Sequence, residues 1–304
     1  MLAVVVALIP VFVLIVLGYA MRRLEFVPEA FWPPAEKLTY YVTFPALLVQ
    51  NLAEADVAGL PVLPLAGVEA TATVLSGLAL LLAWRWLDVS GPAFTSMIQG
   101  AIRPNTYVGL AAAASLYGAR GVTLMAICVA AVVPLVNLLS VVAMVRLASG
   151  HASGWRAMVL PVAKNPLILA CLAGIFLNLA GIGLPLWASQ TLRILGSAAL
   201  PIGLLAVGAG LHLRALRRTG SHVLLTSACK LLLLPLLAVA GAAWVGLDGM
   251  ARGVALLYAA LPCSASAYVL ARQMGGDAGL MANIISTQTL LAAITIPLLL
   301  IGFP

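Results

Sequence analysis

Apolar runs of about 20 residues follow one another through this sequence, with short polar breaks between them. A run of that length is what an α-helix needs to cross the hydrocarbon core of a bilayer. Transmembrane barrels instead alternate apolar and polar residues along each strand. The runs therefore predict an all-α polytopic membrane protein.

The composition excludes several other classes. Of the 304 residues, 63% are apolar and 8% are charged, which is too few charges to cover a soluble globule. The net charge of +7 does not predict a nucleic-acid partner, because the basic residues are scattered at the ends of apolar runs. No HExxH or GxSxG motif occurs and no His lies in mid-span, so an enzyme is not expected. The cysteines show no metal-site spacing, and no metal or cofactor is predicted; they are Cys128, Cys171, Cys229 and Cys263.

Breaks that contain turn residues divide the chain into ten predicted spans. We place them at 2–21, 37–54, 63–85, 93–117, 121–147, 157–180, 186–212, 221–246, 252–273 and 279–302. With the N-terminus outside, the inner loops hold Arg22, Arg23, Lys37, Arg85, Arg146, Arg156, Arg214, Arg217, Arg218 and Arg272. The outer loops hold only Arg120 and Arg252. Because basic loops stay in the cytoplasm, we expect a bacterial-type inner membrane protein with both termini outside.

Two prolines occupy matching positions in the fourth and ninth spans. Pro104 and Pro262 both lie in mid-run, and each run ends at a glycine 14 residues later, Gly118 or Gly276. The chain therefore divides into two halves of five spans, residues 1–150 and 151–304. Five is an odd number, so the second half inserts upside down relative to the first. Inverted repeats with interrupted helices are the best sequence pointer to the binding site of a transporter.

The chemistry around these prolines suits an anion. A mid-span proline removes one backbone N–H, and the freed backbone groups need partners in a polar cavity. Small polar residues crowd both positions, namely Asn105, Thr106, Ser264 and Ser266. Half-helix N-termini there present N–H groups and positive dipole ends. Plain kinks are the alternative, since prolines are tolerated in many membrane helices.

Specific residues around both prolines resemble the auxin efflux carrier family. The strongest matches are Pro104-Asn105-Thr106 and Ala260-Leu261-Pro262 with Tyr268-Val269-Leu270-Ala271-Arg272. Weaker matches are Phe44-Pro45-Ala46-Leu47-Leu48, Asn165-Pro166, the Gly-rich stretch 201–210, and Lys230 with Pro235. The family includes the plant PIN-FORMED carriers and bacterial malate or malonate permeases, and it is related to the fold of bile-acid symporters and sodium–proton antiporters.

The resemblance implies ten transmembrane helices in a 5+5 inverted repeat, with helices 4 and 9 broken and crossing. It also implies an elevator mechanism, with spans 1, 2, 6 and 7 as the scaffold and spans 3–5 and 8–10 as the transport domain. A homodimer through the scaffold is expected, and Asn105 takes the family position at the substrate crossover. The plant carriers have a large hydrophilic inner loop, which residues 148–155 replace here.

The candidate substrate-binding residues gather around the two prolines. They are Asn105, Pro104, Thr106, Arg103, Tyr107, Pro262, Cys263, Ser264, Ser266, Gln50, Asn51, Asn137 and Tyr268. Candidate charge or coupling residues are Glu69, Lys230 and Gln288.

Four of these residues have alternative readings. Asn105 can hold a carboxylate oxygen or cap the broken backbone. Arg103 can bind an anion, snorkel to the interface or pair with Glu69. Glu69 and Lys230 can pair with each other, or one of them can carry a coupling proton.

These observations predict a secondary active or facilitative transporter for small organic anions, in particular carboxylates. The coupling ion is H⁺ or Na⁺, or absent. The alternatives are a cation-coupled symporter of an amphipathic or neutral solute and a channel-like bundle on the same fold, whose flux would not saturate.

Overall fold

The computed structural model describes residues 2–55, 60–149, 164–211 and 220–303. These residues form helices and no strand. The first half contains α1 (Leu2–Arg23), η1 (Glu29–Phe31), α2 (Trp32–Leu38), η2 (Thr39–Thr43), α3 (Phe44–Ala53), α4 (Val62–Ala83), η3 (Trp84–Trp86), α5 (Gly91–Ile102), α6 (Thr106–Met144) and η4 (Val145–Ser149). The second contains α8 (Pro166–Leu179), α9 (Leu186–Ser197), α10 (Ala199–Ala209), α11 (Ser221–Ala228), η6 (Cys229–Leu233), α12 (Leu234–Trp244), α13 (Gly249–Ala259), α14 (Ser266–Met274) and α15 (Ala278–Gly302).

Six helical stretches of the described residues are long and apolar enough to cross a membrane. They are Leu2–Arg23, Val62–Trp86, Thr106–Ala148, Leu186–Ala209, Ser221–Trp244 and Ala278–Gly302. This confirms the all-α polytopic membrane class. The count of ten spans and the 5+5 inverted repeat stay predictions.

The predicted spans that are missing from these six have identifiable structures. The second span is divided among α2, the π-turn η2 and α3, and the ninth between the short helices α13 and α14. The fourth is divided between α5 and the first part of α6, which continues through a kink into the fifth. Gly118 forms this kink with φ of 62° and ψ of −154°, a conformation that favours glycine. In the sixth span, only α8 lies within the described residues, because residues 157–163 fall outside them.

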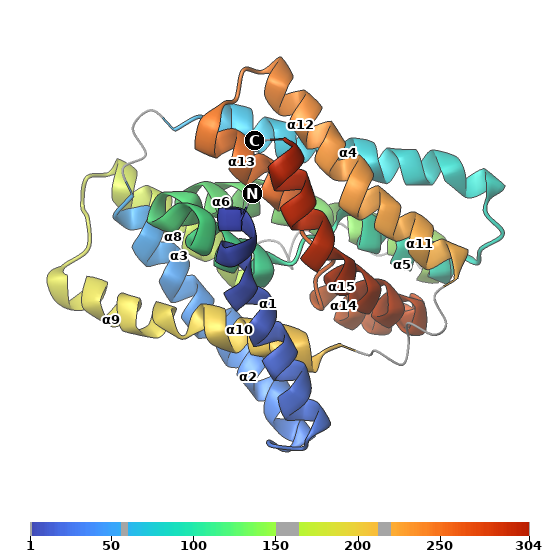
Figure 1. Cartoon of the computed structure of the whole chain (residues 1–304), viewed down its shortest axis with the longest axis horizontal. Helices are drawn as coiled ribbons and strands as arrows, with labels where there is room; N and C mark the ends of the chain where they lie inside the picture. The colour runs from blue at the N-terminus through green and yellow to red at the C-terminus, as the bar shows by residue number, and fades with distance from the viewer. Residues whose placement is uncertain (1, 56–59, 150–163, 212–219, 304) are drawn as a thin grey trace.

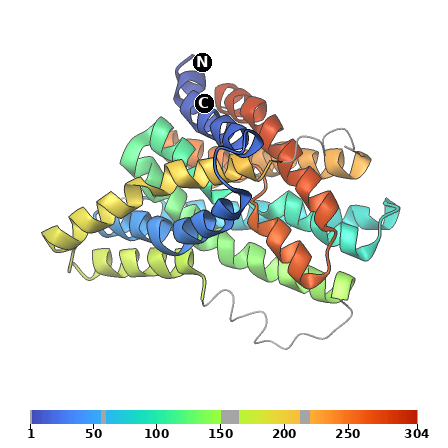
Figure 2. The ribbon, with the colours of Figure 1, turned by 90° about the horizontal axis from the view of Figure 1, so that it is seen from below.

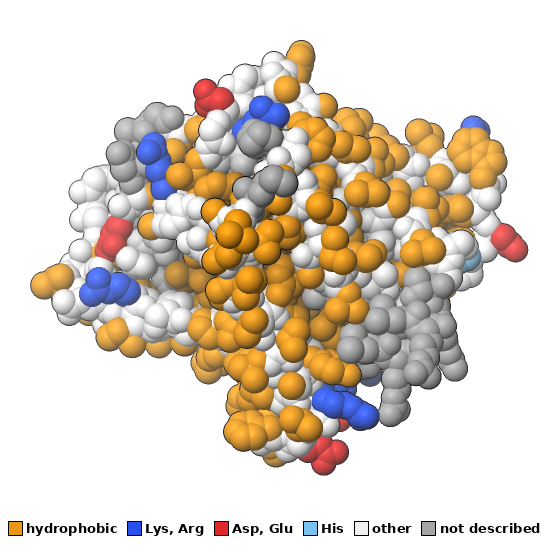
Figure 3. Space-filling model, in the orientation of Figure 1, with side chains coloured by type: hydrophobic (Ala, Val, Ile, Leu, Met, Phe, Trp, Pro, Cys, Tyr) orange, Lys and Arg blue, Asp and Glu red, His pale blue; other side chains and the backbone are white. Residues whose placement is uncertain are grey.

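Apolar side chains cover much of the outer surface, as a bilayer requires. Figure 3 shows them spread across the face formed by α1, α10 and α15. On α1, Val6, Val13 and Val16 are each more than half exposed, which in water would be a costly arrangement. In a bilayer the same side chains contact lipid hydrocarbon instead of water, so their exposure carries no such cost.

The helices gather at two ends of the molecule. At one end α3, α8 and α9 lie together, and at the opposite end α5 packs against α11 and α15 (Figures 1 and 2). The long helix α6 contacts members of both groups. The two interrupted helices therefore meet in the middle of the molecule, between these groups.

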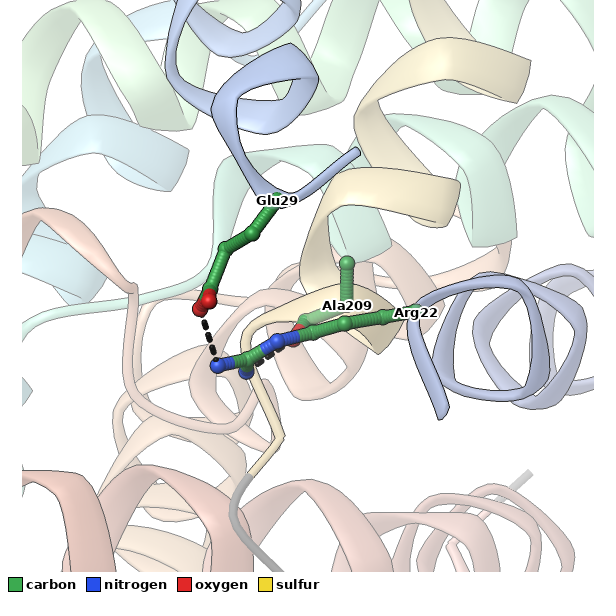
Figure 4. A network of polar contacts seen from close by, with 3 residues as sticks. All are labelled: Arg22, Glu29 and Ala209. Carbon is green, nitrogen blue, oxygen red and sulfur yellow. Dashed lines mark hydrogen bonds and ion pairs between the residues drawn. The ribbon is translucent and has the colours of Figure 1, made fainter. Parts of the chain in front are cut away.

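Helix α1 packs tightly against α10 through glycines. A Cβ atom at Gly208 would overlap the carbonyl oxygen of Ile15, and one at Gly18 would overlap that of Leu205. Small residues of this kind let two helix backbones approach closely in a membrane. At the end of the contact, Arg22 donates to the carbonyl of Ala209 and to the carboxylate of Glu29, both at 2.7 Å (Figure 4).

Candidate functional site

Both interruptions predicted from the matched prolines are present. Helix α5 ends at Ile102 and α6 begins at Thr106, with Pro104 between them. Helix α13 ends at Ala259 and α14 begins at Ser266, with Pro262 between them. We call these segments, residues 103–105 and 260–265, the first break and the second break.

The two breaks lie side by side. Pro104 and Cys263 form an isolated antiparallel bridge, and the backbone N–H of Asn105 donates to the carbonyl of Pro262 at 2.8 Å. A single strand-like contact thus joins segments that are far apart in the sequence. Pro104 has no N–H to donate. The bond to the second break is therefore made by the next residue, Asn105.

Side chains from other helices complete the broken backbone. The amide of Gln288, on α15, accepts from the N–H of Cys263 at 2.9 Å and donates to the carbonyl of Gly100 at 3.1 Å. The ammonium of Lys230, in η6, donates to the carbonyl of Ala259 at 3.3 Å. Freed backbone groups in a membrane need such partners, so both residues stabilise the breaks.

Asn105 caps the helix that follows it. Its side-chain oxygen accepts from the N–H groups of Tyr107 and Val108 at 3.2 and 3.3 Å. The side chain is only 2% exposed, yet its amide nitrogen has no hydrogen bond to the described residues. The capping role predicted for Asn105 is therefore present, and it leaves the donor end of the amide for a ligand.

Arg103 links the first break to two other segments. Its guanidinium donates to the hydroxyls of Ser140 on α6 and Ser266 on α14, each at 3.3 Å. A guanidinium has five N–H donors, so donors remain after these two bonds. Ser140 was not among the predicted residues, although a lone hydroxyl in an apolar span is a signal of this kind.

Neither predicted ion pair of Glu69 forms. Within the described ranges, the one ion pair closer than 4 Å joins Arg22 and Glu29. Glu69 is completely buried on α4, and neither of its carboxyl oxygens has a hydrogen-bond partner among those residues. Lys230 is 1% exposed and interacts with Glu69 electrostatically without contacting it.

The other candidates divide into those at the breaks and those outside them. At the second break, the hydroxyls of Ser264 and Ser266 lie 3.0 Å apart. Thr106 and Tyr107 open helix α6, directly after the first break. Tyr268 faces Arg272 on the same helix, with the guanidinium carbon 6.0 Å from the ring centroid. Asn137 is half-buried on α6 and makes no hydrogen bond within the described part of the chain.

Gln50 and Asn51 line a separate cavity. It measures about 340 Å³, and its other lining residues are Glu54, Ala55, Ala119, Arg120 and Thr123. Gln50 donates to the carboxylate of Glu54 at 2.8 Å, and Asn51 donates to the carbonyl of Leu47 at 2.8 Å. Since none of the lining residues belongs to either break, the structure separates these two from the rest of the candidate site.

Comparison with known proteins points to membrane transport. A family model described as membrane transport protein matches residues 155–300. A protein of Methanothermobacter thermautotrophicus named an uncharacterized transporter is 28% identical over 293 residues, which cover 95% of this chain and 94% of that protein. Both matches are to membrane transport proteins, and they support the resemblance of this chain to the auxin efflux carrier family.

Proposed function

We propose that this transporter moves small organic anions, in particular carboxylates, and binds them where the two breaks meet. The observation that carries this proposal is the pairing of Asn105 with Pro262, which holds the breaks together while the Asn105 amide nitrogen stays free to donate. Arg103 adds a positive charge with unused N–H groups beside the same break. Charge-assisted bonds from such donors are the strong contacts that a carboxylate makes.

The helix ends at the breaks favour the same ligand. Helices α6 and α14 both begin next to the bridge, at Thr106 and Ser266. The N-terminus of a helix carries a partial positive charge, although side chains at the breaks already accept from the N–H groups of Tyr107, Val108 and Ser266. Two such helix ends beside one guanidinium form a region suited to a small anion.

In this proposal the substrate site becomes accessible from each side of the membrane in turn by an elevator mechanism, in which one domain moves against a fixed scaffold. The scaffold consists of α1–α3 and α8–α10, and the moving domain of α4–α6 and α11–α15. The placement of α3, α8 and α9 at one end and of α5 and α11 at the other supports this division (Figure 1). The protein works as a homodimer through the scaffold, in an inner membrane with both termini outside.

Uptake into proteoliposomes tests this function. The purified protein is reconstituted, and labelled mono- and dicarboxylates are offered with and without a sodium gradient, a proton gradient and an imposed voltage. We expect saturable uptake of at least one acid, which also separates a transporter from a channel. Uptake of no acid by well-folded protein would overturn the carboxylate assignment, and flux that does not saturate would favour the channel.

Glu69 carries the coupling proton in this proposal. An ionised carboxylate without hydrogen bonds in the interior is strongly disfavoured, and Glu69 has no such bonds among the described residues. It therefore takes up a proton when it is buried and releases it when water reaches it.

Glu69→Gln should uncouple transport from the proton gradient. The variant cannot release a proton, so we expect loss of accumulation driven by a pH gradient, while exchange of labelled for unlabelled substrate continues. Ser76→Ala is the matched control, because Ser76 is a buried residue of the same helix whose hydroxyl also has no partner in the described structure. Accumulation by the Gln variant at the wild-type level would exclude Glu69 as the proton carrier.

A further inference from the structure

The segment formed by α2, η2 and α3 has a face, outside the candidate set above, that meets Tyr107 beside the first break. Glu36 on α2, Tyr40 in η2 and Phe44 at the start of α3 form it, and we call it the Glu36 face. An α-helix turns by about 100° per residue, which would carry Phe44 about 80° past the direction of Glu36. The five-residue π-turn η2 turns by roughly 85° per residue, which removes most of that offset. The π-turn thus aligns the three side chains.

Phe44 fixes this face against the first break. Its ring stacks on Tyr107, with centroids 4.5 Å apart and planes inclined by 21°. Gly203 on α10 leaves room for the stack, because a Cβ there would lie 3.1 Å from Phe44 and 3.2 Å from Tyr107. Tyr107 is two residues after Asn105, so the stack holds the Glu36 face beside the proposed binding groups.

Opposite charges approach the same two phenols. Glu36 and Tyr40 both lie within electrostatic range of the Tyr107 hydroxyl. Tyr40 in turn lies within electrostatic range of Arg103. The half-buried carboxylate of Glu36 accepts no hydrogen bond from the described residues. A donor offered by a ligand would satisfy this carboxylate, whereas a second anionic group would be repelled by it.

We propose that the Glu36 face is the second wall of the substrate site and that Glu36 determines specificity. The substrate is a monocarboxylate that also carries a hydrogen-bond donor, either a hydroxyl or an ammonium group. Its carboxylate lies toward Arg103 and Asn105, and its donor lies toward Glu36. Dicarboxylates are rejected, because their second carboxylate would face Glu36. This inference rests on the proposed function and narrows it.

Four acids of three carbons test the inference: propionate, lactate, alanine and malonate. Relative to propionate, lactate and alanine carry a hydroxyl or an ammonium group on the carbon next to the carboxylate, and malonate has a second carboxylate in place of the methyl group. In proteoliposomes at pH 7.5, we expect uptake of lactate or alanine to exceed that of malonate by about tenfold or more, since like charges brought together are strongly unfavourable. Preference for lactate identifies a hydroxyl as the donor, and preference for alanine identifies an ammonium.

Variants of Glu36 test whether this residue causes the preference for lactate or alanine over malonate. Glu36→Gln should bring malonate to within about threefold of the preferred acid, because the repulsion is lost. Glu36→Asp, which keeps the charge, should keep the preference. Glu25→Gln is the control, because it makes the same chemical change at an exposed position. Glu36→Ser gives the same information if the Gln variant is poorly folded.

The outcomes separate this inference from the proposed function. Saturable uptake with malonate preferred by the wild type, or with the same selectivity in Glu36→Gln, would overturn the role of Glu36 and leave the transporter proposal standing. If neither the four acids nor any carboxylate of the wider panel is taken up, both the role of Glu36 and the proposed function are overturned.

Discussion

Replacing Asn105 by Ala is expected to abolish transport or reduce it to a small residue, while the same change at Asn165 leaves transport intact. The two asparagines make the same local structure. Asn165 caps α8 by accepting from the N–H groups of Leu167 and Ile168 at 3.0 and 3.3 Å. Both side chains are almost completely buried. They differ in their surroundings, since only Asn105 lies where the two breaks meet.

This pair of variants separates folding from binding. Loss of an N-cap costs about 1 kcal/mol in either case, so both variants should lower the thermal unfolding midpoint in detergent to a similar extent. The further loss in Asn105→Ala is the loss of the free amide donor. Uptake into proteoliposomes at matched protein content is the measurement. If the Asn105 variant transports at the rate of the Asn165 variant, the substrate does not bind at the breaks.

Gly208→Ala is expected to have the largest effect on stability. The added methyl group would overlap the carbonyl oxygen of Ile15, which belongs to the backbone of α1 and cannot rotate away. Overpacking of this kind costs about 1–3 kcal/mol, and here two helices must separate to relieve it. We expect a lower unfolding midpoint in detergent and a lower yield of folded protein.

Gly67→Ala is the control for this change. Gly67 lies within α4, and a Cβ there would meet no atom within 4 Å. Alanine is the better helix former, so this variant should be as stable as the wild type or slightly more stable. Gly18→Ala should behave like Gly208→Ala, because it acts on the same contact from the other helix. Equal unfolding midpoints for all three variants would show that α1 and α10 do not pack through their backbones.

The interruptions could be predicted from the sequence because proline acts locally. Pro104 and Pro262 each remove an N–H and disfavour helical geometry at the preceding residue. Pro10, Pro134 and Pro297 lie inside continuous helices, so the matched positions and the small polar residues beside Pro104 and Pro262 were also needed for the prediction. The membrane class could be predicted for a similar reason, since apolar runs need no knowledge of tertiary contacts. Asn105 also follows from local chemistry, as an amide next to a break is a natural helix cap.

The partners of the charged residues could not be predicted. Arg103 binds two serines and Lys230 a backbone carbonyl, and these contacts depend on how distant helices meet. The π-turns could not be predicted, because no residue pattern is specific to them. Without η2, the alignment of Glu36 with Phe44 is hidden, since helical periodicity places the two residues on different faces. Gln50 and Asn51 line a cavity away from the breaks. Their position likewise depends on how distant helices pack, so it could not be predicted.

The bonds of Gln288 have a consequence for the order in which the protein is assembled. Gly100 enters the bilayer early in synthesis, but the amide that binds its carbonyl belongs to α15, which is made last among the described helices. Until α15 arrives, that carbonyl must be hydrated or held by another partner, because a bare polar group in hydrocarbon is costly. The end of α5 at the first break therefore gains this hydrogen-bond partner only after the ribosome has made α15.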